Sequence, residues 1–232
     1  EPCAHLRGAL RDDRKADVMR ILITHESSGV CREAWRALGH EAYSCDLQAA
    51  DDGSPHHLQL DAIEAIRNHG PWDLIGMHPP CTYLTGAGIH WNDRGRGWGE
   101  TLNALAHVKA CIAAAGDVPW YMENPVGIIS TWLRKPDQII QPYNFGEDAS
   151  KKTCLWLNRL PKLTGAHRFP GRMVTLPNGK TVERWSNQTD SGQNRLGPSP
   201  TRWKERSKTY AGIAKAMAEQ WSRALVITLQ PL

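Results

Sequence analysis

Strand-like and helix-like stretches alternate through the first two thirds of the chain, and this alternation constrains the fold more than any other feature. Runs typical of strands occupy residues 20–24, 40–46, 72–77 and 119–122. Helical spacing of apolar residues separates them: Val30, Ala34 and Leu38 share one face of a helix that Gly39 ends, Ile63 and Ile66 share another, and residues 101–115 form a longer helix. This order is typical of parallel strands joined by crossover helices. We therefore predict an α/β fold with a doubly wound, mostly parallel sheet.

The pattern changes after Pro136. Residues 139–145 and 153–157 predict an antiparallel hairpin at the edge of the sheet, whereas residues 161–200 lack periodicity and predict an irregular insert. Ile213, Met217 and Trp221, spaced by four, predict a closing helix. We expect four segments: a disordered leader (1–18), a main domain (19–160), a small basic insert (161–208) and a C-terminal helix that completes the main domain (209–232).

Composition excludes several classes of protein. The 232 residues contain no apolar run of the roughly 20 residues that a membrane span needs. The six cysteines include no CxxC pair, so neither a zinc site nor a disulfide framework is indicated. We expect a soluble, monomeric, cytoplasmic protein with no bound metal and no membrane partner.

Positive charge is concentrated late in the chain. Residues 151–210 contain 13 Lys and Arg against three Asp and Glu, a net charge of +10, while the rest contains 15 against 21, or −6. A basic segment on an acidic body favours a polyanion as partner, because Lys and Arg displace counterions from phosphates. A solvated basic loop is the alternative.

Polar residues follow the predicted strands, where ligands bind in open α/β sheets. A tight turn, His25-Glu26-Ser27-Ser28-Gly29, follows the first strand. Asp46 follows the second and is suited to ribose hydroxyls, and Asp61 could accept a hydrogen bond from an adenine amine. Together they indicate a site for a nucleoside cofactor, although each aspartate could simply cap a helix.

A cysteine follows the next strand, in His78-Pro79-Pro80-Cys81. The two prolines stiffen the backbone ahead of Cys81, and its thiolate would be a competent nucleophile. Glu123-Asn124-Pro125 ends the neighbouring strand, so Glu123 could share a pocket with Cys81 although 42 positions separate them. The alternatives are an inert buried thiol and an ordinary capping or salt-bridging glutamate.

These motifs resemble those of the DNA cytosine-5 methyltransferases, and most closely the small phage-type members, from about Met19 to Trp221. The resemblance is carried by Pro79-Pro80-Cys81, by Glu123-Asn124-Pro125, and by Phe145-Gly146 followed by Lys151-Lys152-Thr153. It implies a class I (Rossmann-like) methyltransferase fold, S-adenosylmethionine as cofactor, DNA as partner, and the cytoplasm of a bacterial or phage-infected cell.

The resemblance also implies roles for individual residues. Cys81 would be the nucleophile, with Pro80, Glu123 and Asn124 completing the catalytic set. The cofactor would contact Glu26, Ser27, Ser28, Gly29, Asp46, Asp61 and Pro79. DNA would contact Arg94, Arg96, Lys151, Lys152, Thr153, Arg202, Lys204 and Arg206.

The chemistry follows from the weak nucleophilicity of carbon 5 of cytosine. Addition of the Cys81 thiolate to carbon 6 makes carbon 5 electron-rich, and Glu123, with a raised pKa, stabilises the charge near ring nitrogen 3. A base in a duplex must first be flipped out, and residues 82–100, with Trp91 and Trp98, could form a lid and strand clamp or a flexible surface loop. Only 60 residues, 151–210, would serve both as the basic hairpin and as a target-recognition unit. Members of the family that read specific sites generally carry a larger module there, so we expect short or relaxed sequence specificity. Around Arg202 we expect contact with the DNA backbone, the alternative being a solvated helix start.

Two other functions remain open at this stage. One is methylation of an exocyclic amine, of RNA or of a free nucleotide, which needs no cysteine. The other is a non-catalytic DNA-binding protein on a degenerate methyltransferase fold, which would not bind the cofactor.

Overall fold

The computed structural model describes residues 18–165, 167–200 and 202–229. Most of the predicted leader, residues 1–17, lies outside the described residues. The strands of the main sheet are β1 (Arg20–Thr24), β2 (Glu41–Cys45), β3 (His57–Leu58), β4 (Leu74–Met77), β5 (Trp120–Pro125), β6 (Gln138–Ile140) and β7 (Thr153–Asn158). The helices are α2 (Val30–Arg36), α3 (Ala62–Asn68), α4 (Gly86–Ile89), α5 (Gly99–Ala115), α6 (Ile129–Trp132), α7 (Arg202–Ser207) and α8 (Ala211–Leu229), with 3-10 turns η1 (Asn92–Arg94) and η2 (Pro142–Asn144).

The seven strands form one sheet in the order β3-β2-β1-β4-β5-β7-β6. All neighbouring pairs from β3 to β5 are parallel, and β7 is antiparallel to both β5 and β6. The chain moves outward from β1 to β3 and then returns to place β4 beside β1, so the strand order reverses between β1 and β4. Ligands of open α/β sheets bind outside the carboxyl ends of the strands at such a reversal.

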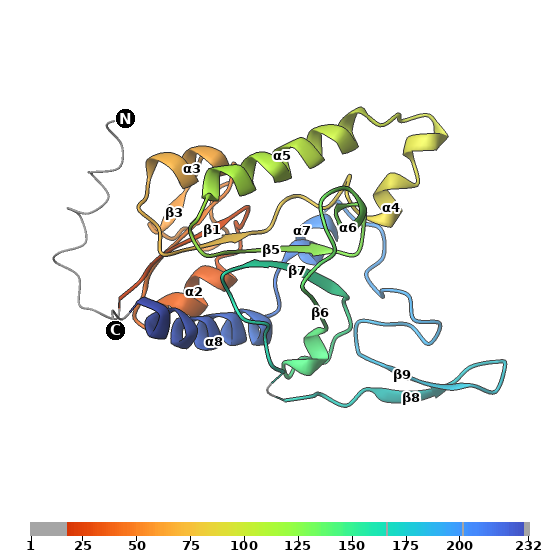
Figure 1. The fold of residues 1–232 in the computed structure, drawn as a ribbon. Helices are drawn as coiled ribbons and strands as arrows, with labels where there is room; N and C mark the ends of the chain where they lie inside the picture. Colours follow the sequence, from red (N-terminus) through yellow and green to blue (C-terminus); the bar gives the residue numbers. More distant parts are fainter. Residues whose placement is uncertain (1–17, 166, 201, 230–232) are drawn as a thin grey trace.

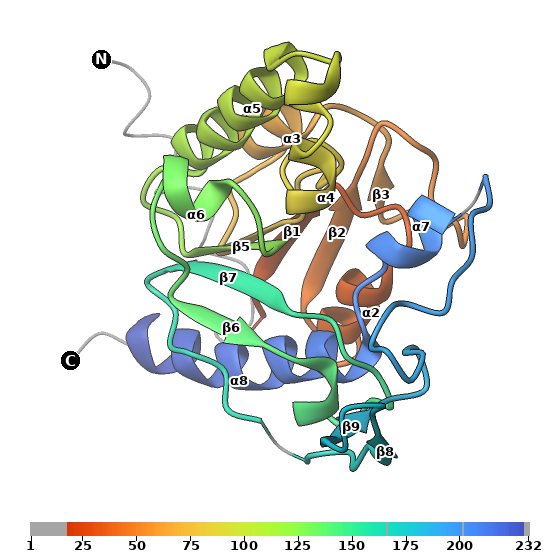
Figure 2. The ribbon, with the colours of Figure 1, turned by 90° about the vertical axis from the view of Figure 1, so that its right-hand side faces the viewer.

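Helices cover both faces of the sheet, as Figure 1 shows, with α3 and α5 on one side and α2 and α8 on the other. The view in Figure 2, turned by 90°, shows the same layers with the sheet between them. Each face has its own core: Trp35, Met217 and Trp221 pack on one side, and Leu105 and Trp156 on the other. The predicted α/β architecture with an antiparallel hairpin at one edge is therefore confirmed.

Some predicted boundaries were wrong. Helix α2 ends at Arg36, and Leu38 lies beyond it with 43% of its surface exposed, because the chain turns through Gly39 with φ of +85°. The strand expected over 139–145 is confined to β6, because Pro142 has no N–H to continue the ladder and starts η2 instead. By contrast, strand β5 runs through Pro125, so Glu123, Asn124 and Pro125 form its end, as predicted.

The insert is more regular than the sequence indicates. It contains a two-stranded antiparallel sheet, β8 (Arg172–Thr175) and β9 (Thr181–Arg184), which extends away from the main sheet in Figure 1. Most of its side chains are partly or fully exposed, so apolar alternation is absent. The Asn178-Gly179 pair forms the turn of this hairpin, with φ of +79° at Gly179. Asn-Gly is a typical hairpin turn, but without apolar alternation on either side it was not recognised as one. None of the helices within the described ranges combines the length and apolar character needed to cross a bilayer.

Candidate active site

The predicted catalytic residues come together at the carboxyl edge of β4 and β5. Cys81 lies four residues after the end of β4 and is partly exposed. Of the two prolines that precede it in the sequence, Pro79 is buried and Pro80 is exposed. Glu123 and Asn124 are buried at the end of β5. The Asn124 side chain donates from Nδ2 to the Pro79 carbonyl at 2.8 Å and so ties the end of β5 to the backbone that carries Cys81.

The Glu123 carboxylate lies in a polar pocket despite its burial. Its Oε2 lies 3.6 Å from His78 Nδ1, and its Oε1 lies 4.0 Å from Lys151 Nζ. Burial alone raises the pKa of Glu123, but Lys151, His78 and Thr153 outweigh it, so the pKa lies below its ordinary value. The expected raised pKa was therefore wrong for the ligand-free protein, where Glu123 is ionised at neutral pH.

The pKa of Cys81 is shifted in the opposite direction from that of Glu123. Burial raises the pKa of its thiol, the Glu123 charge raises it further, and Lys151 and Arg206 lower it only in part. The resting pair is therefore a protonated thiol beside an ionised carboxylate, with the Lys151 ammonium close to both.

Two residues of this site were not singled out from the sequence. His78 reaches Tyr121 Oη at 3.1 Å through Nε2 and Thr209 Oγ1 at 3.4 Å through Nδ1. Its position directly before the Pro-Pro pair was the available signal. Thr209 comes from the segment between α7 and α8, and no local pattern marks a residue that reaches the site from 131 positions away.

The segment after Cys81 is held against the segment after β5. The Cys81 carbonyl accepts hydrogen bonds from Leu84 N at 3.0 Å and Thr85 N at 3.1 Å, and Ile128 N donates to the Leu84 carbonyl at 2.8 Å. Gly127 makes this approach possible, because a Cβ there would overlap the Leu84 carbonyl oxygen.

A Gly127→Ala variant is therefore expected to lose about 1–3 kcal/mol of stability and to displace the Cys81 loop. Gly86→Ala is the matched control in the same pair of segments, since a Cβ at Gly86 meets nothing within 4 Å. Urea unfolding measures the stability. The rate of Cys81 alkylation measures the displacement of the loop, because it depends on how accessible the thiol is. Equal unfolding midpoints for the two variants would contradict this role of Gly127.

Residues 82–100 do not form the open loop considered from the sequence. They contain α4, η1 and the start of α5, because hydrogen bonds within the segment hold it in these turns. Arg96 donates from Nη2 to the Gly88 carbonyl at 2.7 Å and lies over the Tyr83 ring at 4.8 Å, so its guanidinium is already engaged within the chain. Trp98 donates to Asp93 at 3.0 Å, whereas Trp91 is exposed, as is Arg94.

The predicted cofactor turn leads from β1 into α2. The Glu26 carboxylate accepts from Cys31 N at 2.7 Å and Arg32 N at 3.1 Å, so it caps α2. Gly29 has φ of +72°, and a Cβ there would overlap the fully buried Arg32 side chain, which donates to Ser44 at 2.7 Å and contacts Asp52. Sequence reasoning missed Arg32, because a helical arginine is usually exposed.

The two predicted cofactor aspartates have different environments. Asp61 caps α3 through Ile63 N at 2.8 Å and Glu64 N at 3.2 Å. Asp46 is partly exposed and accepts from Gln48 N at 3.0 Å, and a carboxylate has further acceptor capacity. With the partly exposed Ser27 and Ser28, Asp46 offers polar groups to a ligand beside the strand reversal.

Several residues predicted to contact DNA also make contacts within the chain. Lys204 on α7 pairs with Asp51 at 2.6 Å, and Asp51 N donates to the Ser27 carbonyl at 2.8 Å, so α7 is fastened beside the cofactor turn. Lys151 Nζ donates to the Arg206 carbonyl at 3.1 Å. Thr153 is buried at the start of β7.

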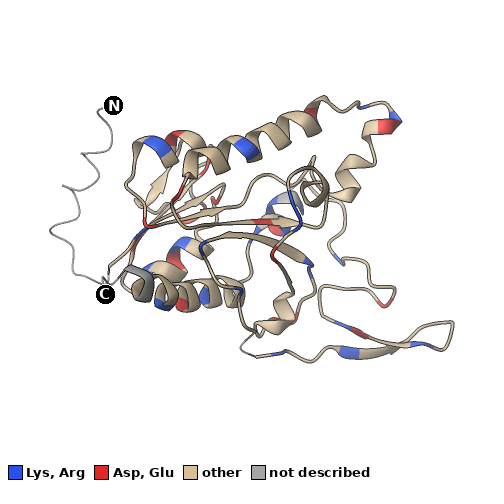
Figure 3. Cartoon of the chain, viewed as in Figure 1, with Lys and Arg blue, Asp and Glu red and all other residues tan. Residues whose placement is uncertain are grey.

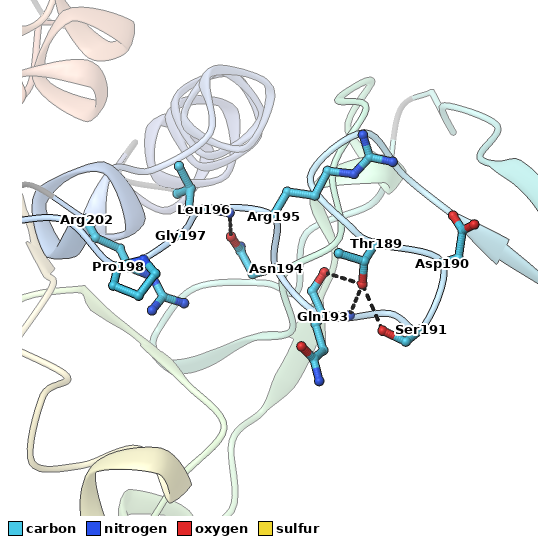
Figure 4. Close-up of a pocket in the computed structure, with 10 residues that line it drawn as sticks. All are labelled: Thr189, Asp190, Ser191, Gln193, Asn194, Arg195, Leu196, Gly197, Pro198 and Arg202. Atoms are coloured by element: carbon cyan, nitrogen blue, oxygen red, sulfur yellow. Dashed lines mark hydrogen bonds between the residues drawn. The ribbon is translucent and has the colours of Figure 1, made fainter.

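Other predicted DNA contacts are available at the surface. Lys152 and Arg206 are exposed, and Arg202 is partly exposed. Lys and Arg recur along the insert and α7, with a few acids among them (Figure 3). The insert also contains an open hollow of about 850 Å³, which Figure 4 shows. Its lining residues are Thr189, Asp190, Ser191, Gln193, Asn194, Arg195, Leu196, Gly197, Pro198 and Arg202.

No model of a known protein family matches the sequence, and no curated protein matches it significantly.

Proposed function

We propose that the protein is an S-adenosylmethionine-dependent DNA cytosine-5 methyltransferase with short or relaxed sequence specificity. One observation carries this proposal: Cys81 and Glu123 share one site at the ends of adjacent strands, with Asn124 bonded to the backbone before the cysteine. The position of this pair beside the strand reversal supports it, because that is where open α/β sheets bind ligands. The doubly wound sheet with an edge hairpin agrees with the fold that the resemblance implies.

The resting protonation states suggest how the reactive pair forms. The Cys81 thiol is protonated and Glu123 is ionised, so one proton passing from the sulfur to the carboxylate produces both reactive forms. The thiolate then bonds to carbon 6 of cytosine, and the ring electrons move toward carbon 5 and nitrogen 3. Glu123 returns the proton toward nitrogen 3 and so stabilises the developing negative charge.

The cofactor would be held by Ser27, Ser28, Gly29 and Asp46. It would lie against the edge of the sheet at which the strand order reverses. When bound, S-adenosylmethionine supplies the electrophilic methyl group that carbon 5 attacks. The carbon 5 proton then leaves to solvent, and the bond between carbon 6 and the Cys81 sulfur breaks. The proton near nitrogen 3 returns through Glu123 to the sulfur, which restores the ring, the thiol and the ionised carboxylate. Glu26 acts indirectly in this proposal, by capping α2 and fixing the turn.

DNA would lie across the insert and α7. Lys152, Arg202 and Arg206 offer positive charge to phosphates, which gives affinity without sequence information. The hollow lined by Thr189 to Pro198 offers amide and hydroxyl groups to base edges, but it is one small surface. A recognition surface of this size is consistent with a short target sequence or with relaxed sequence specificity.

Nucleoside analysis tests the proposal. DNA is incubated with the purified protein and cofactor carrying a deuterated methyl group, then digested and analysed by chromatography and mass spectrometry. We expect labelled 5-methyldeoxycytidine. Label on an exocyclic nitrogen, or no label despite measured cofactor binding, would overturn the proposal.

Methylation of an exocyclic amine is the second candidate, and the raised pKa of Cys81 favours it. Burial keeps the thiol protonated at rest, and an amine accepts a methyl group without a thiolate. The same chromatogram separates the two functions, because the N4-methyl and 5-methyl isomers of deoxycytidine have different retention times.

A further inference from the structure

Three metal-ligating side chains meet on the α5 side of the sheet, beside the turn that carries the proposed cofactor residues. His107 and Cys111 are one helical turn apart on α5, and His25 reaches them from the turn after β1. One ligand atom from each lies within 4.8 Å of the other two. Only the i,i+4 spacing on α5 is visible in the sequence, which otherwise indicates no metal site.

The ring nitrogens of the two histidines face each other. His25 Nε2 lies 2.8 Å from His107 Nε2, and Cys111 Sγ lies 3.5 Å from the same His107 nitrogen. To reach this position His25 adopts φ of +58°, a left-handed conformation that is uncommon for residues other than glycine.

Hydrogen bonding orients His25 for coordination. The Thr24 hydroxyl lies 3.3 Å from the Gly76 carbonyl, to which it donates, so it accepts from His25 Nδ1 at 3.0 Å. That bond places the proton of His25 on Nδ1 and leaves an Nε2 lone pair directed at the cluster. Metal-binding histidines are typically held in this way by a bond to the other ring nitrogen.

The dimensions suit a zinc ion. Ligand atoms about 2.0–2.3 Å from a tetrahedral zinc are roughly 3.3–3.6 Å apart. The His107–Cys111 separation of 3.5 Å already falls in that range, and the His25–His107 separation of 2.8 Å needs to open by about half an ångström. Side-chain rotation is sufficient for such a change.

We infer that His25, His107 and Cys111 form a binding site for a zinc-type transition metal ion that fastens the turn after β1 to α5. Imidazole nitrogen and thiolate sulfur are the ligands that zinc prefers. Binding transfers the Cys111 thiol proton to solvent and moves the His107 proton from Nε2 to Nδ1. A water molecule would complete the four ligands. The site does not depend on the proposed methylation activity.

Cobalt substitution tests the site in the full-length protein. Protein stripped with a chelator is titrated with Co²⁺ and then with Zn²⁺. We expect one equivalent of cobalt to give the intense visible bands of a tetrahedral complex and a thiolate-to-cobalt charge-transfer band, both lost when zinc displaces it. Release of one proton per metal in weak buffer is the accompanying signal.

Cys111→Ser and His107→Gln should each lower the affinity roughly a hundredfold or more, because even outer-shell changes cost about 10- to 100-fold. Cys154→Ser and His90→Ala, a buried cysteine and an exposed histidine outside the cluster, should bind as the wild type does. A wild-type spectrum without the tetrahedral and thiolate bands would overturn the inference, and this measurement needs no variant to fold. Equal cobalt affinity in wild type and in a folded Cys111→Ser protein would do the same.

Discussion

A Cys81→Ser variant is expected to lose cytosine methylation by at least about a thousandfold, since a serine hydroxyl at this position is a far weaker nucleophile toward carbon 6. The loss should fall on the chemical step. Cofactor and DNA affinities, measured by calorimetry, should stay within about twofold of the wild type, because Cys81 is at the rim of the sheet and serine is nearly isosteric.

A mechanism-based trap extends this prediction. DNA that carries 5-fluorocytosine should form a stable adduct with the wild-type protein when cofactor is present, because fluorine at carbon 5 prevents the final elimination. Peptide mapping should place the bond on Cys81. Cys154→Ala, which changes a buried cysteine on the neighbouring β7, should still form the adduct. Full methylation by Cys81→Ser would remove the sulfur from the mechanism.

Glu123→Gln is expected to slow methylation by roughly 10²- to 10⁴-fold, the usual contribution of a positioned acid or base. The amide neither accepts the Cys81 proton nor shares one with nitrogen 3, so adduct formation should slow as well. Raising the pH should partly restore the adduct rate of the variant, because solvent can then deprotonate the thiol. The exposed Glu100→Gln is the control and should match the wild type at every pH. Equal rates for Glu123→Gln and the wild type would exclude Glu123 from proton transfer.

The same variant should change how stability depends on pH. The pKa of Glu123 is lower when folded than its ordinary value of 4.5, because Lys151, His78 and Thr153 outweigh the effect of burial. Its stabilising contribution is therefore present above about pH 4.5 and is lost as the pH falls through the lower, folded value. The wild type should be more stable than Glu123→Gln at neutral pH, and the difference should shrink in acid. Urea unfolding across this range measures it, and a difference independent of pH would contradict the ionised state.

The environment of Glu123 shows why protonation was harder to predict than position. A Glu123 that shares a proton with ring nitrogen 3 requires a raised carboxyl pKa, and that was the expectation from sequence. Of the three groups that reverse it, two are ionisable: His78, with Nδ1 at 3.6 Å, and Lys151, with Nζ at 4.0 Å, come from different segments. A pKa sums every charge around a group, whatever its distance along the chain.

Local order along the chain was sufficient to predict the architecture. Strands β1, β4 and β5 and helices α5 and α8 follow from apolar periodicity, because a segment that buries one face must repeat its apolar residues at the period of that structure. The alternation of these elements implied the parallel sheet and the edge at which open α/β sheets generally bind ligands. The sequence pattern failed to predict strands whose side chains are largely exposed, as in β8 and β9. It also failed where one residue ended a strand early, as Pro142 did in shortening β6.

By itself, then, the sequence determined the layers, the order in which strands and helices alternate, and the strand ends that carry Cys81, Asp46 and Glu123. Only the tertiary structure decided which side chains meet there. It brought Thr209 to His78, engaged Lys204 with Asp51, turned Glu26 into a helix cap, and assembled His25 with His107 and Cys111. The physical reason is range: backbone periodicity depends on neighbours a few residues away, whereas hydrogen bonds, ion pairs and coordination depend on where packing places distant segments.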